Sequence, residues 1–196
     1  VLVEEETTDM IALRLSATSV RNMLMGNQPE LETIAIEGQH LLRRPWDWRK
    51  FRDASLEFDL QVIAQRMPKV DAAPVGTTIT GPAYIGPGST VLEQSNIKPN
   101  TAIGPVCKVA GEIGGTVFQG YANKAHAGHL GDSWIGEWSN LGADTTNSNL
   151  LNTYTQVNAR ATSNASMEKT GETFLGVTMG DHVKTAIGTR IMTGCV

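Results

Sequence analysis

The sequence predicts a mainly β protein, a parallel β-helix of hexapeptide repeats preceded by a helical segment at the N-terminal end. Aliphatic side chains recur at every sixth residue, Gly, Pro, Ser, Thr and Asn fill the positions between them, and residues 1–70 lack this repeat. The aliphatic residues in strict register are Ile79, Ile85, Val91, Ile97, Ile103 and Val109.

A period of six matches neither the helical period nor the alternation of a simple strand. It is typical of a β-helix in which each hexad supplies a short strand and a turn, and three hexads close one triangular coil. The β-branched side chains point into this prism and stack on their equivalents in the next coil. Successive coils should rise by about 4.8 Å, the spacing of paired strands.

The repeat is interrupted twice. Two extra residues enter after Val109, and the six-residue marks then fall on Val117, Asn123, His129, Ile135 and Leu141. Residues 147–173 are rich in Asn, Thr and Ser, which predicts an inserted loop. The β-helix is therefore predicted over residues 71–196, with this loop inside it.

Residues 1–70 form a helical segment in this interpretation. Residues 18–25 and about 48–66 have apolar side chains at spacings of three and four, as in Leu56, Leu60 and Ile63. Pro45 precedes the second predicted helix and Pro68 follows it, as is common near helix ends. We interpret this segment as the tail of a preceding domain with its linker.

Composition narrows the function classes. The net charge is -4 and the pI about 5.6, which argues against nucleic acid as a partner. The sequence contains no apolar run long enough to span a bilayer and begins with no signal peptide, so we expect no membrane partner. Two cysteines make no disulfide framework, and a cytoplasmic location is expected. The chain begins without Met and stops within the repeat, which suggests a piece of a longer protein.

Four stretches carry a resemblance to a known family: GPVCKVAGE at residues 104–112, GYANKAH at 120–126, LGDSWIGEWSNLGA at 130–143 and GDHVKTAIGT at 180–189. They resemble the C-terminal half of sugar nucleotidyltransferases related to the bifunctional N-acetylglucosamine-1-phosphate uridylyltransferase/glucosamine-1-phosphate acetyltransferase. The resemblance implies a left-handed coil and a homotrimer with active sites between subunits. It also implies acetyl-CoA as co-substrate and an amino-sugar phosphate as acceptor, in the synthesis of UDP-N-acetylglucosamine.

The nucleotidyl-transfer half of that family opens with a Gly-rich loop carrying Arg and Lys, and no such loop or Walker-type phosphate loop occurs in this sequence. We therefore expect Mg²⁺ only if a nucleotidyltransferase domain missing from this chain is present.

The resemblance points to His126 as the catalytic base, because the family's catalytic His lies four residues before a Leu-Gly-Asp motif, here Leu130 to Asp132. Imidazole titrates near neutrality and can take a proton from an attacking amine. We predict that six further residues line the same cleft and bind substrate or acyl donor: Lys124, His129, Asn140, Asn149, His182 and Lys184. The alternatives are an interface histidine without chemistry, solvated lysines, and asparagines that belong to turns or ladders.

Two positions depart from the family pattern. Glu112 falls where the acetyltransferase carries a basic residue near the sugar phosphate, and a carboxylate there would repel phosphate. Asp144 replaces a residue that is usually Gly, where an unusual φ is expected.

Two other functions remain open at this stage. One is a non-catalytic trimerisation or regulatory domain of a sugar-1-phosphate nucleotidyltransferase. The other is a trimeric metal-dependent hydratase with zinc held by His126, His129 and His182. The i, i+3 spacing of the first two histidines does not fit such a site, so we predict no metal.

Overall fold

A computed structural model describes the chain except for residues 1, 5–9, 13–15, 28–33, 37–40 and 65–74. The chain divides into two compact units, Val1–Leu41 and Leu42–Val196. None of the helices in the described part is long and apolar enough to cross a membrane.

The described residues of the first unit form one helix and three short strands. These are β1 (Leu2–Glu4), β2 (Met10–Ala12), α1 (Ala17–Leu24) and β3 (Ile34–Ile36). The strand β1 pairs antiparallel with β2 and parallel with β3. Helix α1 begins after Ser16, whose Oγ accepts the backbone N–H of Ser19 at 3.0 Å, a normal N-cap. The periodic spacing predicted this helix, but strands of three residues are too short to leave a pattern.

The second unit begins with a segment that leads into helix α2 (Trp48–Ala64), which the sequence also predicted. The carboxylate of Asp47 accepts the backbone N–H groups of Arg43 and Arg44, so this approach to the helix is tightly turned. The predicted end of the helix, with Pro68, lies outside the described residues.

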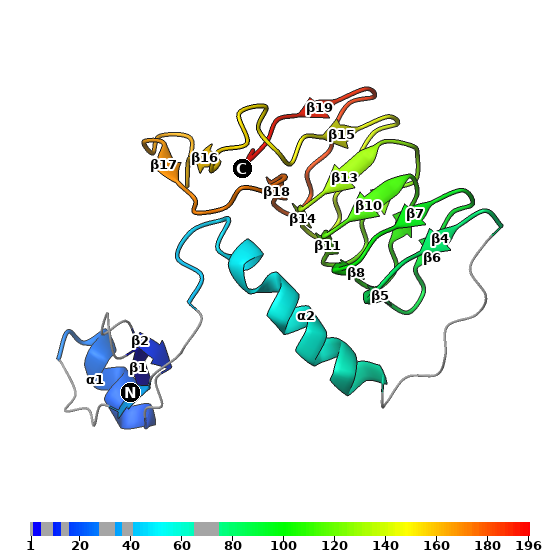
Figure 1. Ribbon diagram of the computed structural model, residues 1–196. Helices are drawn as coiled ribbons and strands as arrows, with labels where there is room; N and C mark the ends of the chain where they lie inside the picture. Colours follow the sequence, from blue (N-terminus) through cyan, green and yellow to red (C-terminus); the bar gives the residue numbers. More distant parts are fainter. Residues whose placement is uncertain (1, 5–9, 13–15, 28–33, 37–40, 65–74) are drawn as a thin grey trace. The chain divides into compact units, whose positions relative to one another are not determined.

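The rest of the second unit is a left-handed parallel β-helix, as the sequence predicted, in which consecutive strands pass to three different faces (Figure 1). The first face contains β4 (Thr78–Ile79), β7 (Asn96–Ile97), β10 (Glu112–Gly114) and β13 (His129–Gly131). The second contains β5 (Ala83–Ile85), β8 (Thr101–Ile103), β11 (Val117–Phe118), β14 (Trp134–Ile135) and β18 (Thr178–Met179). The third contains β6 (Thr90–Val91), β9 (Lys108–Val109) and β12 (Asn123–Lys124).

All strand pairs within these three faces are parallel. The third face continues as a ladder of single bridges from Asn123 to Asn140 and from Asn140 to Lys184. Two later strands, β15 (Thr146–Asn147) and β19 (Arg190–Ile191), also pair in parallel.

The inward side chains form the core of the β-helix. Ile97, Ile103 and Val109 are 0% exposed, and each stacks on a residue of the neighbouring coil within one apolar cluster. This burial confirms that the periodic residues from Val91 to Val109 fill the prism, whereas Ile79 in the first coil is 38% exposed. Removing aliphatic surface from water stabilises the coil by about 25 cal/mol per Å².

The register predicted after Val109 is wrong by one residue at Val117, Asn123 and His129, and is confirmed at Ile135 and Leu141. The inward residues there are Ile113, Phe118, Lys124, Leu130, Ile135 and Leu141. Phe118 pairs with Ile103, fifteen residues earlier, whereas Ile103 pairs with Ile85, eighteen residues earlier. Because the corners of this coil are shorter, Asn123 and His129 lie on the outer surface and not in the prism.

The predicted inserted loop contains a β-hairpin. Strands β16 (Asn158–Ala159) and β17 (Glu168–Lys169) pair antiparallel. A second apolar cluster joins this insertion to the start of α2, and its buried members are Trp46, Trp48, Val157, Ala159 and Leu175. The indole Nε1 of Trp48 also donates to Thr178 Oγ1 at 3.1 Å. The start of α2 is therefore held against the β-helix.

Substitution of two glycines on the second face, each directly after an inward residue, tests this packing. A Cβ on Gly104 would lie 2.0 Å from the carbonyl oxygen of Gln119, whereas a Cβ on Gly180 would meet nothing within 4 Å. We expect Gly104→Ala to lower the free energy of unfolding by about 3 kcal/mol, because backbone must move to relieve the overlap. The matched control Gly180→Ala should stay within about 0.5 kcal/mol of wild type in thermal and urea unfolding. Equal effects of the two substitutions would contradict the predicted packing of coils.

Candidate functional site

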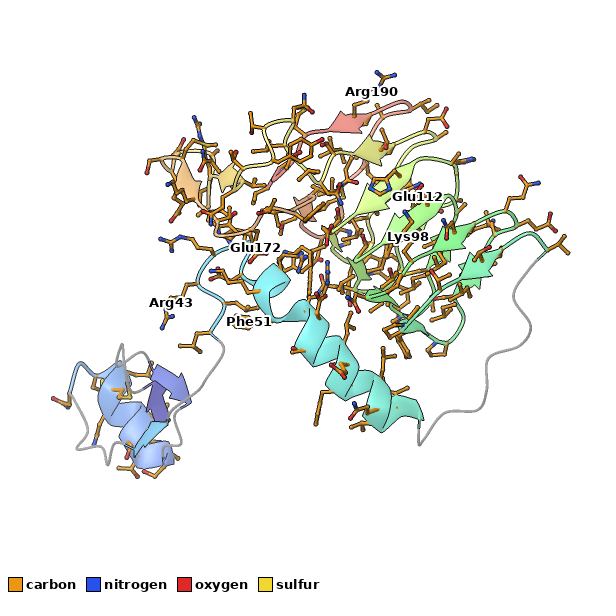
Figure 2. The ribbon with its side chains drawn as sticks, in the orientation of Figure 1. Arg43, Phe51, Lys98, Glu112, Glu172 and Arg190 are labelled. Atoms are coloured by element: carbon orange, nitrogen blue, oxygen red, sulfur yellow. The ribbon has the colours of Figure 1, made fainter. Side chains whose placement is uncertain are left out.

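The outer surface of the first face carries a row of polar side chains. Glu112 pairs in register with Asn96 on one side and His129 on the other. Lys98 Nζ donates to Glu112 Oε1, and His129 Nδ1 lies 3.2 Å from the same oxygen. Figure 2 labels Lys98 and Glu112 side by side on this face. The hydrogen bond from Lys98 lowers the pKa of Glu112, and the charges of His129 and Lys98 contribute to the same direction. The carboxylate is therefore ionised near neutral pH and fixes one ring nitrogen of His129.

Gly131 leaves room for two predicted binding residues to meet. A Cβ at this position would lie 2.5 Å from His129 Nε2 and 2.7 Å from Asn149 Nδ2. Both polar atoms thus lie over the glycine, and the Asn149 amide also donates to Asp132 Oδ2 at 2.8 Å. The structure brings His129 and Asn149 together, and polar side-chain atoms of both converge over Gly131.

Asp132 connects this face to helix α2. Its Oδ1 accepts from an Arg52 guanidinium nitrogen at 2.7 Å, and the same nitrogen donates to the Gly115 carbonyl at 2.5 Å. Sequence reasoning missed Arg52, because no local pattern links a helical residue to a partner 80 residues later in the chain. The one sequence signal for this contact was the Leu-Gly-Asp motif, which contains Asp132.

His126 lies in the corner between the third and first faces, and Lys124 ends strand β12 just before this corner. His126 is exposed. Lys124 is 1% exposed, and its Nζ donates to the carbonyls of Ala110 at 3.2 Å, His126 at 2.8 Å and Ala127 at 3.3 Å. Burial lowers the pKa of Lys124 to about 8, and the charge of Asp144 opposes this shift. Lys124 thus contacts the backbone of the His126 corner from inside and does not line the outer surface.

The other three predicted residues lie together on and beside the third face. The backbone of Asn140 is bridged to Lys184, whose Nζ donates to the Trp138 carbonyl. The ring of His182 stacks on Trp138 with centroids 6.5 Å apart, and Trp138 stacks on Tyr121 at 4.5 Å. Within one chain, the predicted site residues therefore form three groups: His129 with Asn149, His126 with Lys124, and Asn140 with His182 and Lys184.

The two departures from the family pattern have structural explanations. Glu112 is neutralised by Lys98, as described above. Asp144 adopts a φ of 61°, the left-handed conformation expected of a glycine there, which Asp tolerates better than most residues.

The three histidines of the zinc hypothesis do not gather in one chain. His126 lies at a corner, His129 on the first face, and His182 beside Trp138. Among the residues described here, no group of three or more His, Cys, Asp or Glu side chains is arranged to hold a metal ion.

Stacked parallel strands, hexapeptide spacing and a polar outer face define a hexapeptide-repeat β-helix protein. The chain is similar to the bifunctional protein GlmU of Acaryochloris marina (strain MBIC 11017), with 29% identity over 119 residues. The match covers 58% of this chain but only 25% of the relative's length. No model of a known protein family matches the chain. Together, the fold and the similarity confirm the resemblance to the β-helical part of that protein.

The buried ammonium of Lys124 predicts a pH dependence of stability. Its pKa is about 8 in the folded protein and near 10.5 in the unfolded chain, so the unfolded state binds more protons between these values. The contribution of Lys124 to stability therefore rises as pH increases from about 8 to 10.5, by an amount on the order of 3 kcal/mol. Below pH 8 both states are protonated and the contribution is constant and unfavourable.

Urea unfolding at several pH values measures this effect as the difference between wild type and Lys124→Met. We expect the stability advantage of the variant to decrease across pH 8–10.5. A difference that does not change with pH over this range would disprove the predicted titration.

Proposed function

We propose that the β-helix is an acyltransferase-type domain of sugar-nucleotide biosynthesis. It transfers the acetyl group of acetyl-CoA to the amine of an amino-sugar phosphate, with glucosamine 1-phosphate as the acceptor, on the route to UDP-N-acetylglucosamine. The observation that carries this proposal is the similarity to a bifunctional GlmU protein in a chain that folds as a β-helix. The exposed His126 beside a polar face adds chemical support.

In this proposal His126 acts as the base. The acceptor amine attacks the thioester carbonyl, a C–N bond forms, and the C–S bond breaks to release coenzyme A as a thiol. The amine loses a proton to the imidazole, which can return it to the departing sulfur. Backbone N–H groups of the coil are suitable donors for the oxygen that becomes negative in the tetrahedral intermediate.

The first face is the proposed binding surface for the acceptor. His129 Nε2 and Asn149 Nδ2 converge over Gly131, where they can bind hydroxyl groups of a sugar. The Lys98 ammonium pairs with Glu112 and so reduces the repulsion between this carboxylate and a phosphate. An anionic acceptor is therefore compatible with a carboxylate at this position.

We further propose that the chain acts as a homotrimer in the cytoplasm. His126 lies at the corner that follows β12, and the second group, formed by Asn140, His182 and Lys184, lies on and beside the third face. A neighbouring subunit could supply the second group to the cleft of the first. The exposed rings of Tyr121 and Trp138, at 42% and 50%, lie next to that second group and give it apolar surface to bury.

A non-catalytic trimerisation or regulatory domain is the second candidate. In the part of the chain that the structure describes, we find no side chain that orients the ring of His126, although catalytic histidines commonly have such a partner. This observation favours a scaffold, and an activity measurement distinguishes it from an acyltransferase.

The test is release of free thiol from acetyl-CoA in the presence of glucosamine 1-phosphate, together with the molar mass of the protein in solution. We expect turnover by wild type and a loss on the order of 100-fold or more in His126→Ala, because a general base contributes about that much. The variant should keep the wild-type melting temperature, since His126 is exposed.

Tyr154→Ala is a suitable control, because Tyr154 is 75% exposed on the insertion and should not affect turnover. Wild type that forms trimers without releasing thiol would favour the scaffold. Turnover that survives His126→Ala would remove His126 from the role of base.

A further inference from the structure

Lys124 occupies a position where the coil otherwise places aliphatic side chains. On the third face Val91 pairs with Val109, and Val109 pairs with Lys124. Leu141, the inward residue of the next coil, is 2% exposed and belongs to the same apolar core. Among the four inward residues from Val91 to Leu141, the lysine is therefore the one charged residue, and it is 1% exposed.

A buried ammonium is not explained by stability. Removal of a charge from water costs several kcal/mol, and hydrogen bonds only offset this cost. A Leu or Met at the same position would fill the column without that cost, as Val109 and Leu141 do in the neighbouring coils. The charge must therefore be explained by what the ammonium binds.

Two of its three acceptors belong to one corner of the chain. These are the carbonyls of His126 and Ala127, at 2.8 and 3.3 Å from Nζ. The next residue, Gly128, has a φ of 118°, and a Cβ there would lie 2.4 Å from the Thr145 carbonyl oxygen and 3.5 Å from Lys124 Nζ. The corner therefore lies between the Lys124 ammonium on its inner side and the next coil on its other side. These two contacts fix the backbone conformation at His126.

We propose that Lys124 is a positioning residue, which holds the corner of residues 125–128 from inside the prism and so fixes where the His126 ring meets the acceptor. This inference rests on the proposed function for the role of His126. Lys124 itself touches no substrate. Lys124 acts on His126 through its hydrogen bond to the His126 backbone carbonyl.

The experiment compares Lys124→Met with Lys108→Met in the full chain. Lys108 lies in the same face, next to Val109, but points outward and is exposed, so it controls for the loss of a lysine. Three quantities are measured: the melting temperature, kcat and KM with acetyl-CoA and glucosamine 1-phosphate, and amide hydrogen exchange in peptides that cover residues 125–128.

We expect Lys124→Met to melt at or above the wild-type temperature, because a methionine suits the aliphatic column. Exchange at the corner should accelerate, and kcat should fall by a factor on the order of 10 to 100 with KM for acetyl-CoA near wild type. Lys108→Met should match wild type in all three measurements. If Lys124 had only a structural role, a variant as stable as wild type would keep the wild-type kcat.

Wild-type kcat and wild-type exchange in Lys124→Met would overturn the proposal. If Lys124→Met does not fold, Lys124→Gln takes its place, because it keeps N–H donors without the charge. If neither variant folds, Lys124 is required for folding, and this result would also overturn the proposal. If wild type shows no turnover, the proposed function fails, and the exchange measurement still decides whether the ammonium holds the corner. Unchanged exchange would then reject the proposal, and faster exchange would support it.

Discussion

The stacking of inward side chains from coil to coil is the constraint on which the structure depends. Each short strand has only two or three residues, so no strand is stable without the coil above and below it. Ile97, Ile103 and Val109 are fully buried because the neighbouring coils cover them. The polar groups of the candidate site lie on corners and outer faces whose positions follow from this stack.

The shortened coil after Val109 has the largest consequence for the site. Because side chains alternate between the two sides of a strand, a shift by one residue exchanges inside and outside. This shift places Lys124 in the prism and His129 on the first face, next to Glu112. His129, which the predicted register placed in the prism, therefore becomes available to a ligand, and a lysine expected at the surface becomes part of the core.

The polar network of the first face also links the β-helix to the segment before it. Asp132 accepts from Arg52 of α2 and from Asn149 of the insertion, so three distant parts of the chain meet at one carboxylate. On the same face, Lys98 compensates the charge of Glu112, which by sequence alone counted against an anionic ligand. The charges of this surface are thus balanced within the chain, and the polar atoms of His129 and Asn149 converge over Gly131.

The sequence by itself determined the β-helix over Ile79 to Val109 and the two helices, because inward positions of a coil and one face of a helix accept mainly apolar side chains, and this leaves a period in the sequence. The resemblance also proposed His129 and Asn149 as candidate binding residues, but not their convergence over Gly131. The lengths of the corners, the burial of Lys124 and the docking of Arg52 were decided only by the tertiary structure. These features depend on contacts between residues far apart in the chain, which no local spacing encodes.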